Sequence, residues 1–151
     1  MRQVDFRSVR EADRTAIIRL WEACDLVRPW NDPGSDVDRK LAVDDGLFIV
    51  GVVDRDVLAT VMAGYDGHRG WINYLAVDPA EQGTGIGGQL MAEAEGRLAA
   101  LGCAKVNLQI RRENDGVGAF YERLGYDGYE DAHLDVGEGQ RLDFWQARKT
   151  L

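Results

Sequence analysis

The sequence predicts a single α/β domain with a mixed, mostly antiparallel sheet of about seven strands and about four helices packed on it. Its 151 residues match the length of one ordinary domain. Strand patterns in the first half are separated by turns too short for a helix, so they form hairpins. A glycine cluster then leads into an amphipathic helix and another strand, which indicates one β-α-β crossover.

The elements follow the order β-α-α-β-β-β-α-β-α-β-β within one domain, 1–151. Strands are expected where apolar residues alternate with polar ones or run together between turns. They cover 2–8, 47–53, 57–65, 71–77, 106–110, 126–134 and 140–147. Helices are expected where apolar residues recur every three or four positions. They cover 13–24, 35–43, 86–101 and 114–124. Ser35 is expected to cap the second helix, after a loop at 28–34 that contains Pro29 and Pro33.

The charge of the chain limits its partners. Lys and Arg number 18 against 26 Asp and Glu, so the formal net charge is −8. Nucleic acids and anionic membranes need a basic face, and neither is an expected partner. An acidic chain favours a cationic partner at long range, although backbone amides still bind an anion locally. No window is as long and apolar as a signal peptide or a membrane span requires, so the expected location is the cytoplasm.

Cysteine and histidine are too sparse for a metal site or a disulfide framework. Cys24 and Cys103 are far apart and are expected to be buried free thiols. His68 and His133 have no ligand motif around them, and His133 is expected to be structural. No metal is therefore expected.

The glycine cluster 83–88 is the strongest local signal in the chain. It matches the dinucleotide fingerprint G-x-G-x-x-G, but no acidic residue ends the following strand, and a hairpin-built sheet precedes the cluster. A P-loop is excluded because no Lys-Ser or Lys-Thr follows the glycines. Bare amides at a helix N-terminus form a cradle for a pyrophosphate. The alternative is a flexible loop that only begins a helix.

Three motifs resemble the GNAT superfamily of N-acetyltransferases. The cluster Gln82–Gly87 matches the acetyl-CoA motif Q/R-x-x-G-x-G/A, and Leu75–Pro79 matches the L-x-V-x-P strand before it. Asn114 with Ala119–Tyr126 is similar to the N…A…F-Y-x-x-x-G-F/Y helix. The resemblance covers essentially the whole chain. Segments 26–33 and 64–70 also resemble the bacterial YpeA-like acetyltransferases.

The resemblance implies an acyltransferase that uses acetyl-CoA, held in a V between two parting central strands. Backbone groups of one strand would hold the pantetheine, and the glycine loop would hold the pyrophosphate. The implied acetyl-CoA residues are Leu75, Ala76, Val77, Gln82, Gly83, Thr84, Gly85, Ile86, Gly87, Gly88 and Asn114. Arg97, Arg111, Arg112 and Arg123 are candidates for the CoA 3′-phosphate.

Acetyl transfer to an amine needs an oxyanion donor, a base for the amine and an acid for the leaving thiolate. The resemblance assigns the acid to Tyr121, although Tyr121 also lies on an apolar helical stripe that is typical of core. Some GNAT enzymes carry a Glu on the strand equivalent to 71–77, and this strand has no acid. Asp66 and His68 are candidate bases, with a water relay or an amine that arrives deprotonated as alternatives.

The loop between the first two helices is expected to bind the acceptor, through Arg28, Trp30, Asn31 and Asp32. The alternative is that Trp30 only fills a gap between helices. The acceptor is expected to be a primary amine on a small molecule, attacked directly in a ternary complex. A peptide or protein N-terminus or lysine is the first alternative, and a non-catalytic acyl-CoA-binding domain is the second. A homodimer through edge strands is plausible because an exposed edge needs covering.

Overall fold

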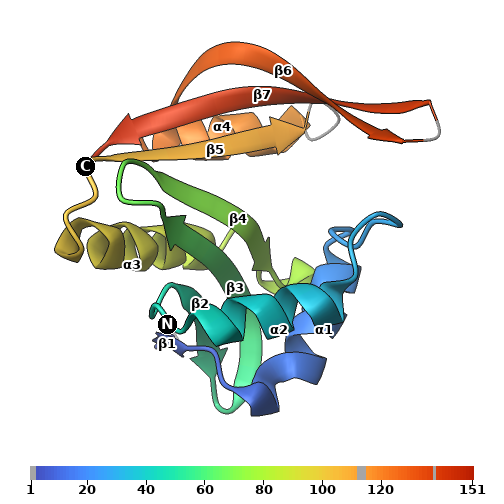
Figure 1. The fold of residues 1–151 in the computed structure, drawn as a ribbon. Helices are drawn as coiled ribbons and strands as arrows, with labels where there is room; N and C mark the ends of the chain where they lie inside the picture. Colours follow the sequence, from blue (N-terminus) through green and yellow to red (C-terminus); the bar gives the residue numbers. More distant parts are fainter. Residues whose placement is uncertain (1–2, 112–114, 138) are drawn as a thin grey trace.

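The computed structural model describes residues 3–111, 115–137 and 139–151, and it confirms the predicted fold class (Figure 1). The described residues form one seven-stranded sheet in the order β1-β2-β3-β4-β5-β7-β6. The strands are β1 (Asp5–Ser8), β2 (Phe48–Val53), β3 (Asp56–Tyr65), β4 (Gly70–Val77), β5 (Lys105–Arg111), β6 (Asp127–Gly137) and β7 (Gln140–Thr150). The helices are α1 (Arg14–Ala23), α2 (Pro33–Val43), α3 (Ile86–Ala100) and α4 (Asp115–Arg123). Short 3-10 turns cover Glu11–Asp13 and Pro79–Glu81.

Neighbouring strands run antiparallel except at one place in the middle of the sheet. There β4 and β5 are parallel, because the α3 crossover joins them. Only three residue pairs connect these two strands, Gly70–Ile72 with Val106–Leu108. Beyond Ile72 the strands diverge, as Figure 1 shows. The sheet is therefore open between β4 and β5 toward their carboxyl ends.

Two hydrophobic clusters hold the helices on the sheet. The cluster around α3 includes Leu90 and Leu98, and Tyr121 of α4 joins it. The other cluster, around α1 and α2, includes Trp21 and Val37. Helical stripes of this spacing bury one face against the sheet, which is why the apolar periodicity predicted these elements well. The predicted helices and strands are confirmed, except that β1 begins at Asp5 instead of residue 2 and that β6 and β7 each extend three residues further at the end.

The start of α2 differs from the prediction. The helix begins at Pro33, and the cap is Asp32 rather than Ser35. The Asp32 carboxylate accepts hydrogen bonds from Ser35 N at 3.3 Å and Ser35 Oγ at 2.6 Å. Proline is well tolerated in the first helical turn because its missing N–H has no partner there in any helix. The proline that marked a loop in the sequence therefore begins a helix.

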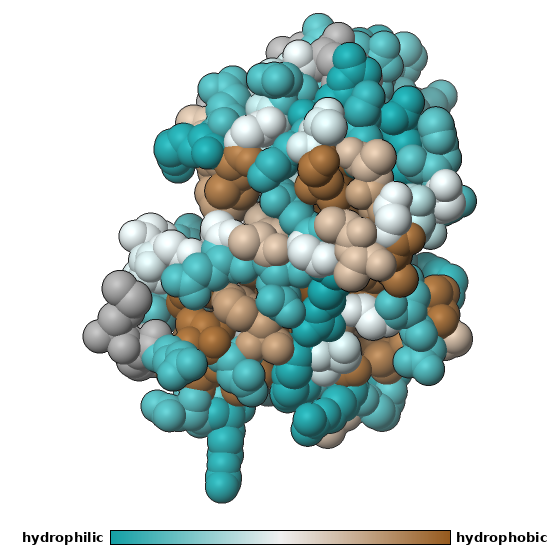
Figure 2. Space-filling model, turned by 90° about the vertical axis from the view of Figure 1, so that its left-hand side faces the viewer, coloured by the Kyte–Doolittle hydropathy of each residue, from teal (hydrophilic) through white to brown (hydrophobic). Residues whose placement is uncertain are grey.

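The surface on the side of the molecule where β4 and β5 still pair is mostly polar. Figure 2 shows hydrophilic side chains over its upper half, with hydrophobic side chains gathered below them. Exposed large apolar residues among those described include Val43 and Leu101. None of the described helices has the length and apolar character that crossing a membrane would require.

Candidate active site

A cleft of about 490 Å³ lies where β4 and β5 part. Its walls come from the loop between α1 and α2, from β4, β5 and β7, and from α4. The lining residues are Cys24, Leu26, Arg28, Asn31, Ile72, Asn73, Tyr74, Leu75, Ala76, Val77, Gln82, Leu108, Gln109, Ile110, Arg111, Val117, Tyr121 and Phe144. The cleft thus brings together the predicted strand, the predicted acid and part of the predicted acceptor loop.

The wall formed by β4 has an unusual backbone. Register with β3 shifts between Thr60 and Met62, and Tyr74 takes a left-handed conformation with φ of 51°. Such a conformation is costly for a residue with a side chain, and bulges of this kind re-aim side chains near active sites. From Asn73 onward, the edge of β4 that faces the cleft pairs with no described strand. This edge includes Leu75, Ala76 and Val77, so their backbone groups are exposed to a ligand in the cleft.

The glycine loop follows Gln82, which lines the same cleft, and its first residues, 83–85, are open to solvent. Gly83 and Gly85 have φ of 81° and 92°, and a Cβ on either would meet no described atom within 4 Å. Gly85 is the N-cap of α3 and supplies no side-chain cap, so the first amides of this helix keep their hydrogen-bonding capacity. Gln82 donates from Nε2 to the Val77 carbonyl at 3.2 Å, which ties the loop to the end of β4. The loop therefore fits an anion-binding cradle.

The later glycines have a different role. A Cβ on Gly87 would come within 3.2 Å of the Phe120 ring, and one on Gly88 within 3.7 Å of Leu124. These glycines let α3 approach α4 closely. Thr84 instead donates from its hydroxyl to the Glu81 carbonyl at 2.6 Å, which shapes the turn. The motif thus combines an open loop with a helix contact.

Tyr121 lies in the cleft wall and is buried. Its ring packs edge-to-face on Phe120 and Tyr126, with centroids 5.0 and 5.7 Å away. Burial raises the pKa of the Tyr121 phenol above its usual value of about 10. The phenol therefore holds its proton at neutral pH. Tyr121 thus packs in the core and also lines the cleft. Its prediction as a core residue is therefore compatible with its prediction as the acid.

The structure places Asp66 and His68 away from the cleft. They lie in the turn before β4, at the end where β4 and β5 still pair. The Asp66 carboxylate accepts from the backbone N–H groups of Arg69 and His68 at 2.7 and 2.8 Å. These bonds lower the pKa of Asp66 and commit its oxygens to the turn. Neither residue lines the cleft.

The acceptor loop is divided between two roles. Arg28 and Asn31 line the cleft, while Asp32 is occupied as the α2 cap. Trp30 lies under the guanidinium of Arg111, with Cζ 5.9 Å from the ring centroid. This contact links the loop to the end of β5 across the mouth of the cleft, a cation–π arrangement. The predicted Asn114 lies outside the described residues, as does Arg112.

The charge of the cleft differs from that of the whole chain. Arg28 and Arg111 line it, and no Asp or Glu does so among the described residues. Of the other arginines proposed for CoA, Arg97 donates to the Gly46 carbonyl at 2.9 Å and Arg123 is exposed in the last turn of α4. The net charge of −8 thus gives no guide to the local field at the mouth of the cleft.

A cluster between β4 and helices α1 and α2, at the cleft wall, was missed in the sequence. Tyr74 donates from its hydroxyl to Asp36 Oδ2 at 2.5 Å, and its ring stacks on Trp21 at 3.9 Å between centroids. Trp21 donates from Nε1 to Thr60 Oγ1 at 3.0 Å, and Thr60 donates to the Tyr74 carbonyl at 3.2 Å. These residues come from four elements, so no local motif joins them. The only sign of this cluster in the sequence was Tyr74, an aromatic residue with a hydroxyl group beside the apolar end of strand 71–77.

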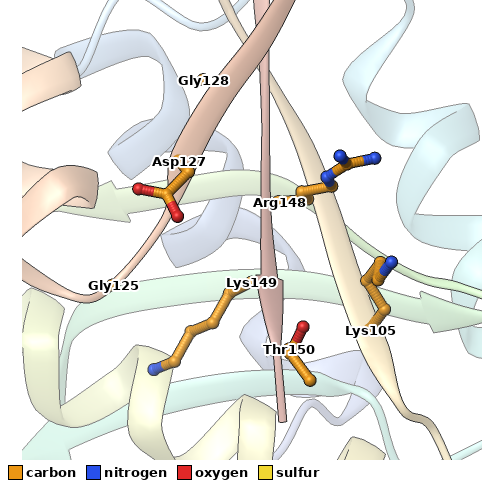
Figure 3. A pocket seen from close by; sticks show the side chains of 7 residues that line it. All are labelled: Lys105, Gly125, Asp127, Gly128, Arg148, Lys149 and Thr150. Atoms are coloured by element: carbon orange, nitrogen blue, oxygen red, sulfur yellow. The ribbon is translucent and has the colours of Figure 1, made fainter.

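A second hollow, of about 550 Å³, lies at the closed end of the sheet near the beginning of β5 and β6. Figure 3 shows that Lys149 points to the opposite side of β7 from Arg148 and Lys105. Lys149 donates to Glu95 Oε1 at 2.8 Å and lies 5.7 Å from the Tyr126 ring centroid. The basic side chains that line this hollow therefore do not point toward one position where a ligand could bind. Among the described residues, no three His, Cys, Asp or Glu side chains are grouped as metal ligands.

Comparisons with known proteins point to one family. The family model described as "Acetyltransferase (GNAT) family" matches residues 15–126. The acetyltransferase ECA0875 of Pectobacterium atrosepticum is 47% identical over 124 residues, which cover 82% of this chain and 88% of that protein.

Solved structures share the fold at lower sequence identity. The putative acetyltransferase yncA of Salmonella typhimurium, solved with its cofactor acetyl-CoA, is 22% identical with a TM-score of 0.78. It covers 99% of this chain and 94% of its own. Ard1 of Thermoplasma volcanium is 18% identical with a TM-score of 0.81, over 98% of this chain and 97% of its own.

Proposed function

Because the chain belongs to the GNAT family of acetyltransferases and takes acetyl-CoA as its acetyl donor, we propose that it acetylates a primary amine on a small molecule by direct attack in a ternary complex. The observation that carries this proposal is the cleft between β4 and β5. It joins an unpaired strand edge, Gln82 at the start of the glycine loop and a buried phenol in one cavity. A cavity of about 490 Å³ is of the size that accommodates small molecules.

The donor half is formed by the β4 edge and the glycine loop. The amides from Gly83 to Gly88 offer hydrogen bonds to the pyrophosphate, and the helix dipole of α3 adds to the attraction. The free edge from Asn73 to Val77 offers backbone groups to the pantetheine arm. A backbone N–H of this edge also suits the oxyanion that develops as the amine attacks.

Direct attack is favoured over an acetyl-enzyme because the cleft has no activated nucleophile among its described residues. Cys24 is the one thiol in the lining, and its Sγ donates to the Val77 carbonyl at 3.2 Å. Burial raises the pKa of this thiol. A thiol that stays protonated is a poor nucleophile. The amine nitrogen is then the group that forms the new bond to the acetyl carbon.

Tyr121 is proposed as the proton donor to the sulfur that leaves. When the tetrahedral intermediate collapses, the C–S bond breaks and the sulfur becomes a thiolate. A phenol that keeps its proton at neutral pH can donate a hydrogen bond to that thiolate and pass the proton to it as the C–S bond breaks. Position and protonation state both suit this role.

The acceptor half supports a small molecule with hydrogen-bonding groups near its amine. Asn31, Asn73 and Gln109 bring amide side chains to the cleft, and Arg28 and Arg111 bring positive charge. Arg28 is already ion-paired with Asp25, at 3.2 Å between Nη1 and Oδ1, so its charge is compensated within the protein. The cleft therefore supports an acceptor with hydrogen-bonding groups without selecting its charge.

An amine panel tests the proposal, with release of CoA thiol as the readout. The panel contains amino acids, polyamines, aminoglycosides and short peptides with a free N-terminus. Turnover of one or more small amines at a kcat/KM at least tenfold above that of the peptides is the expected result. Preference for peptides would favour the N-terminal acetyltransferase alternative. Binding of acetyl-CoA with no turnover of any amine would favour the non-catalytic alternative.

A further inference from the structure

We propose that Tyr74 and Asp36 form the base of the reaction, with Tyr74 contacting the amine and passing its proton to Asp36. The inference rests on the proposed function, because it needs an amine that attacks in the cleft. It addresses a gap in the site. An attacking amine must lose a proton, and strand 71–77 contains no carboxylate to take it.

The connection between the two residues is short and direct. The Tyr74 hydroxyl donates to Asp36 Oδ2 at 2.5 Å, in the range of a charge-assisted O–H···O⁻ bond. Asp36 lies in the first turn of α2, where the helix dipole favours a carboxylate. Its Oδ1 is paired with Arg39. One carboxylate oxygen therefore anchors to arginine while the other is directed at the phenol.

Tyr74 is held in a fixed position at the cleft wall. Its ring stacks on the buried Trp21 with planes 13° apart. Trp21 is fixed by its bond to Thr60, and Thr60 donates in turn to the Tyr74 carbonyl. The left-handed φ at Tyr74 is a strained conformation that this closed set of contacts maintains. Strain of this kind at a cleft residue is typical of a group whose position matters for function.

No described carboxylate competes for this role. The cleft lining contains no Asp or Glu among the residues that the structure describes, and Asp66 is committed to its turn. Asp36 does not line the cleft itself, so it acts through Tyr74. Helix α2 thus supplies the carboxylate that the strand lacks.

The proton transfer balances as follows. The amine lone pair forms the N–C bond, and the C–S electrons leave with the sulfur. The Tyr74 oxygen takes one N–H proton from the ammonium of the intermediate as its own proton moves to Asp36. Tyr121 gives a proton to the thiolate. The products are the acetamide, CoA thiol, protonated Asp36 and the Tyr121 phenolate, and solvent then carries the proton from Asp36 back to Tyr121.

The test compares two amine probes in the full chain, n-butylamine and methoxyamine, by CoA release. Methoxyamine is weakly basic, so its adduct gives up a proton to water more readily. In Asp36→Asn the amide oxygen still accepts the Tyr74 hydrogen bond, but the proton acceptor is lost. We expect kcat for n-butylamine to fall by about 10²-fold and kcat for methoxyamine to fall far less.

Asp38→Asn is the matched control. Asp38 lies on the same helix and is ion-paired with Arg14, so the variant makes the same charge change without touching Tyr74. It should leave both amine rates unchanged. Tyr74→Phe should reproduce the Asp36→Asn pattern, and the double variant should lose little more, because the pair acts as a unit.

Three outcomes overturn the inference. In the first, Asp36→Asn retains the wild-type kcat for n-butylamine. In the second, Asp36→Asn lowers kcat by the same factor for both amines. In the third, the effects of Asp36→Asn and Tyr74→Phe on kcat add in the double variant. Unchanged thermal unfolding and acetyl-CoA affinity in Asp36→Asn exclude a folding defect. A wild-type chain that binds acetyl-CoA but releases no CoA with these two amines or with any amine of the panel contradicts the proposed function itself, and the inference fails with it. Failure of the inference alone gives a different result: the wild type releases CoA with the amines, and the variants release it at the same rate.

Discussion

Three buried or half-buried tyrosines near the cleft differ in what their hydroxyls contact. Burial raises the pKa of Tyr74, Tyr121 and Tyr126. Tyr74 donates to Asp36, and Tyr126 donates to Glu95 Oε2 at 2.7 Å. No described residue accepts from Tyr121. Its proton is therefore the one that a leaving sulfur in the cleft can take without breaking a protein hydrogen bond.

Tyr121→Phe should lower kcat by about 10²-fold, because the thiolate then leaves without a proton donor. The acetyl-CoA dissociation constant should hold, since the ring packing on Phe120 is retained. Steady-state CoA release and calorimetric titration measure the two quantities. Tyr126→Phe is the control. It should cost about 1 kcal/mol of stability by losing the Glu95 bond and leave kcat unchanged. Equal kcat in Tyr121→Phe and wild type rules out the acid role.

At the scale of elements, the junction of the glycine loop with α3 decides donor binding. Gly85 caps the helix at φ of 92°, a conformation that costs an L-residue about 1–2 kcal/mol. Gly85→Ala should therefore shift the loop and weaken acetyl-CoA by about tenfold, measured by calorimetry.

Gly96→Ala is the control on the same helix. It lies in the interior of α3, and a Cβ there meets no described atom within 4 Å. It should stabilise the protein by about 0.5–1 kcal/mol and leave the acetyl-CoA affinity unchanged. If Gly85→Ala binds acetyl-CoA as tightly as Gly96→Ala does, the cradle depends on another part of the loop.

At the scale of the whole molecule, one ion pair ties the first strand to the first helix. Arg7 donates from both terminal nitrogens to the Asp13 carboxylate, at 2.8 and 2.9 Å. These bonds are the largest cause of a lowered pKa at Asp13, and the backbone N–H of Arg10 adds to it. A lowered folded-state pKa stabilises the fold above the unfolded value of about 3.9, and that contribution is lost as pH falls through the folded value.

Asp13→Asn should accordingly lower the unfolding free energy at neutral pH by about 1.5–3 kcal/mol. The difference from wild type should be constant between pH 5 and 8 and shrink below about pH 4, as the wild-type carboxylate gains a proton. Urea unfolding at several pH values measures it. A difference that is the same at pH 3 and pH 7 would contradict a charged pair as its source.

The fold could be predicted from the sequence because the spacing of apolar residues identifies the helices and strands. The short turns between them then allow few folds. The glycine loop and Tyr121 were found because each belongs to a contiguous motif. Asp36 was not found, since it meets Tyr74 only through the packing of α2 on β4. Asp66 was a candidate base by its neighbourhood in sequence, and the pairing of β4 with β5 puts it at the closed end. Side chains that meet across elements need the three-dimensional structure.

The most direct test of direct transfer is a matrix of initial velocities with acetyl-CoA and the best amine of the panel, joined to intact mass of the enzyme during turnover. Attack within a ternary complex predicts intersecting double-reciprocal lines, one N-acetyl product for each CoA released, and an enzyme of unchanged mass. Parallel lines together with an enzyme heavier by one acetyl group, located on Cys24, would contradict attack within a ternary complex.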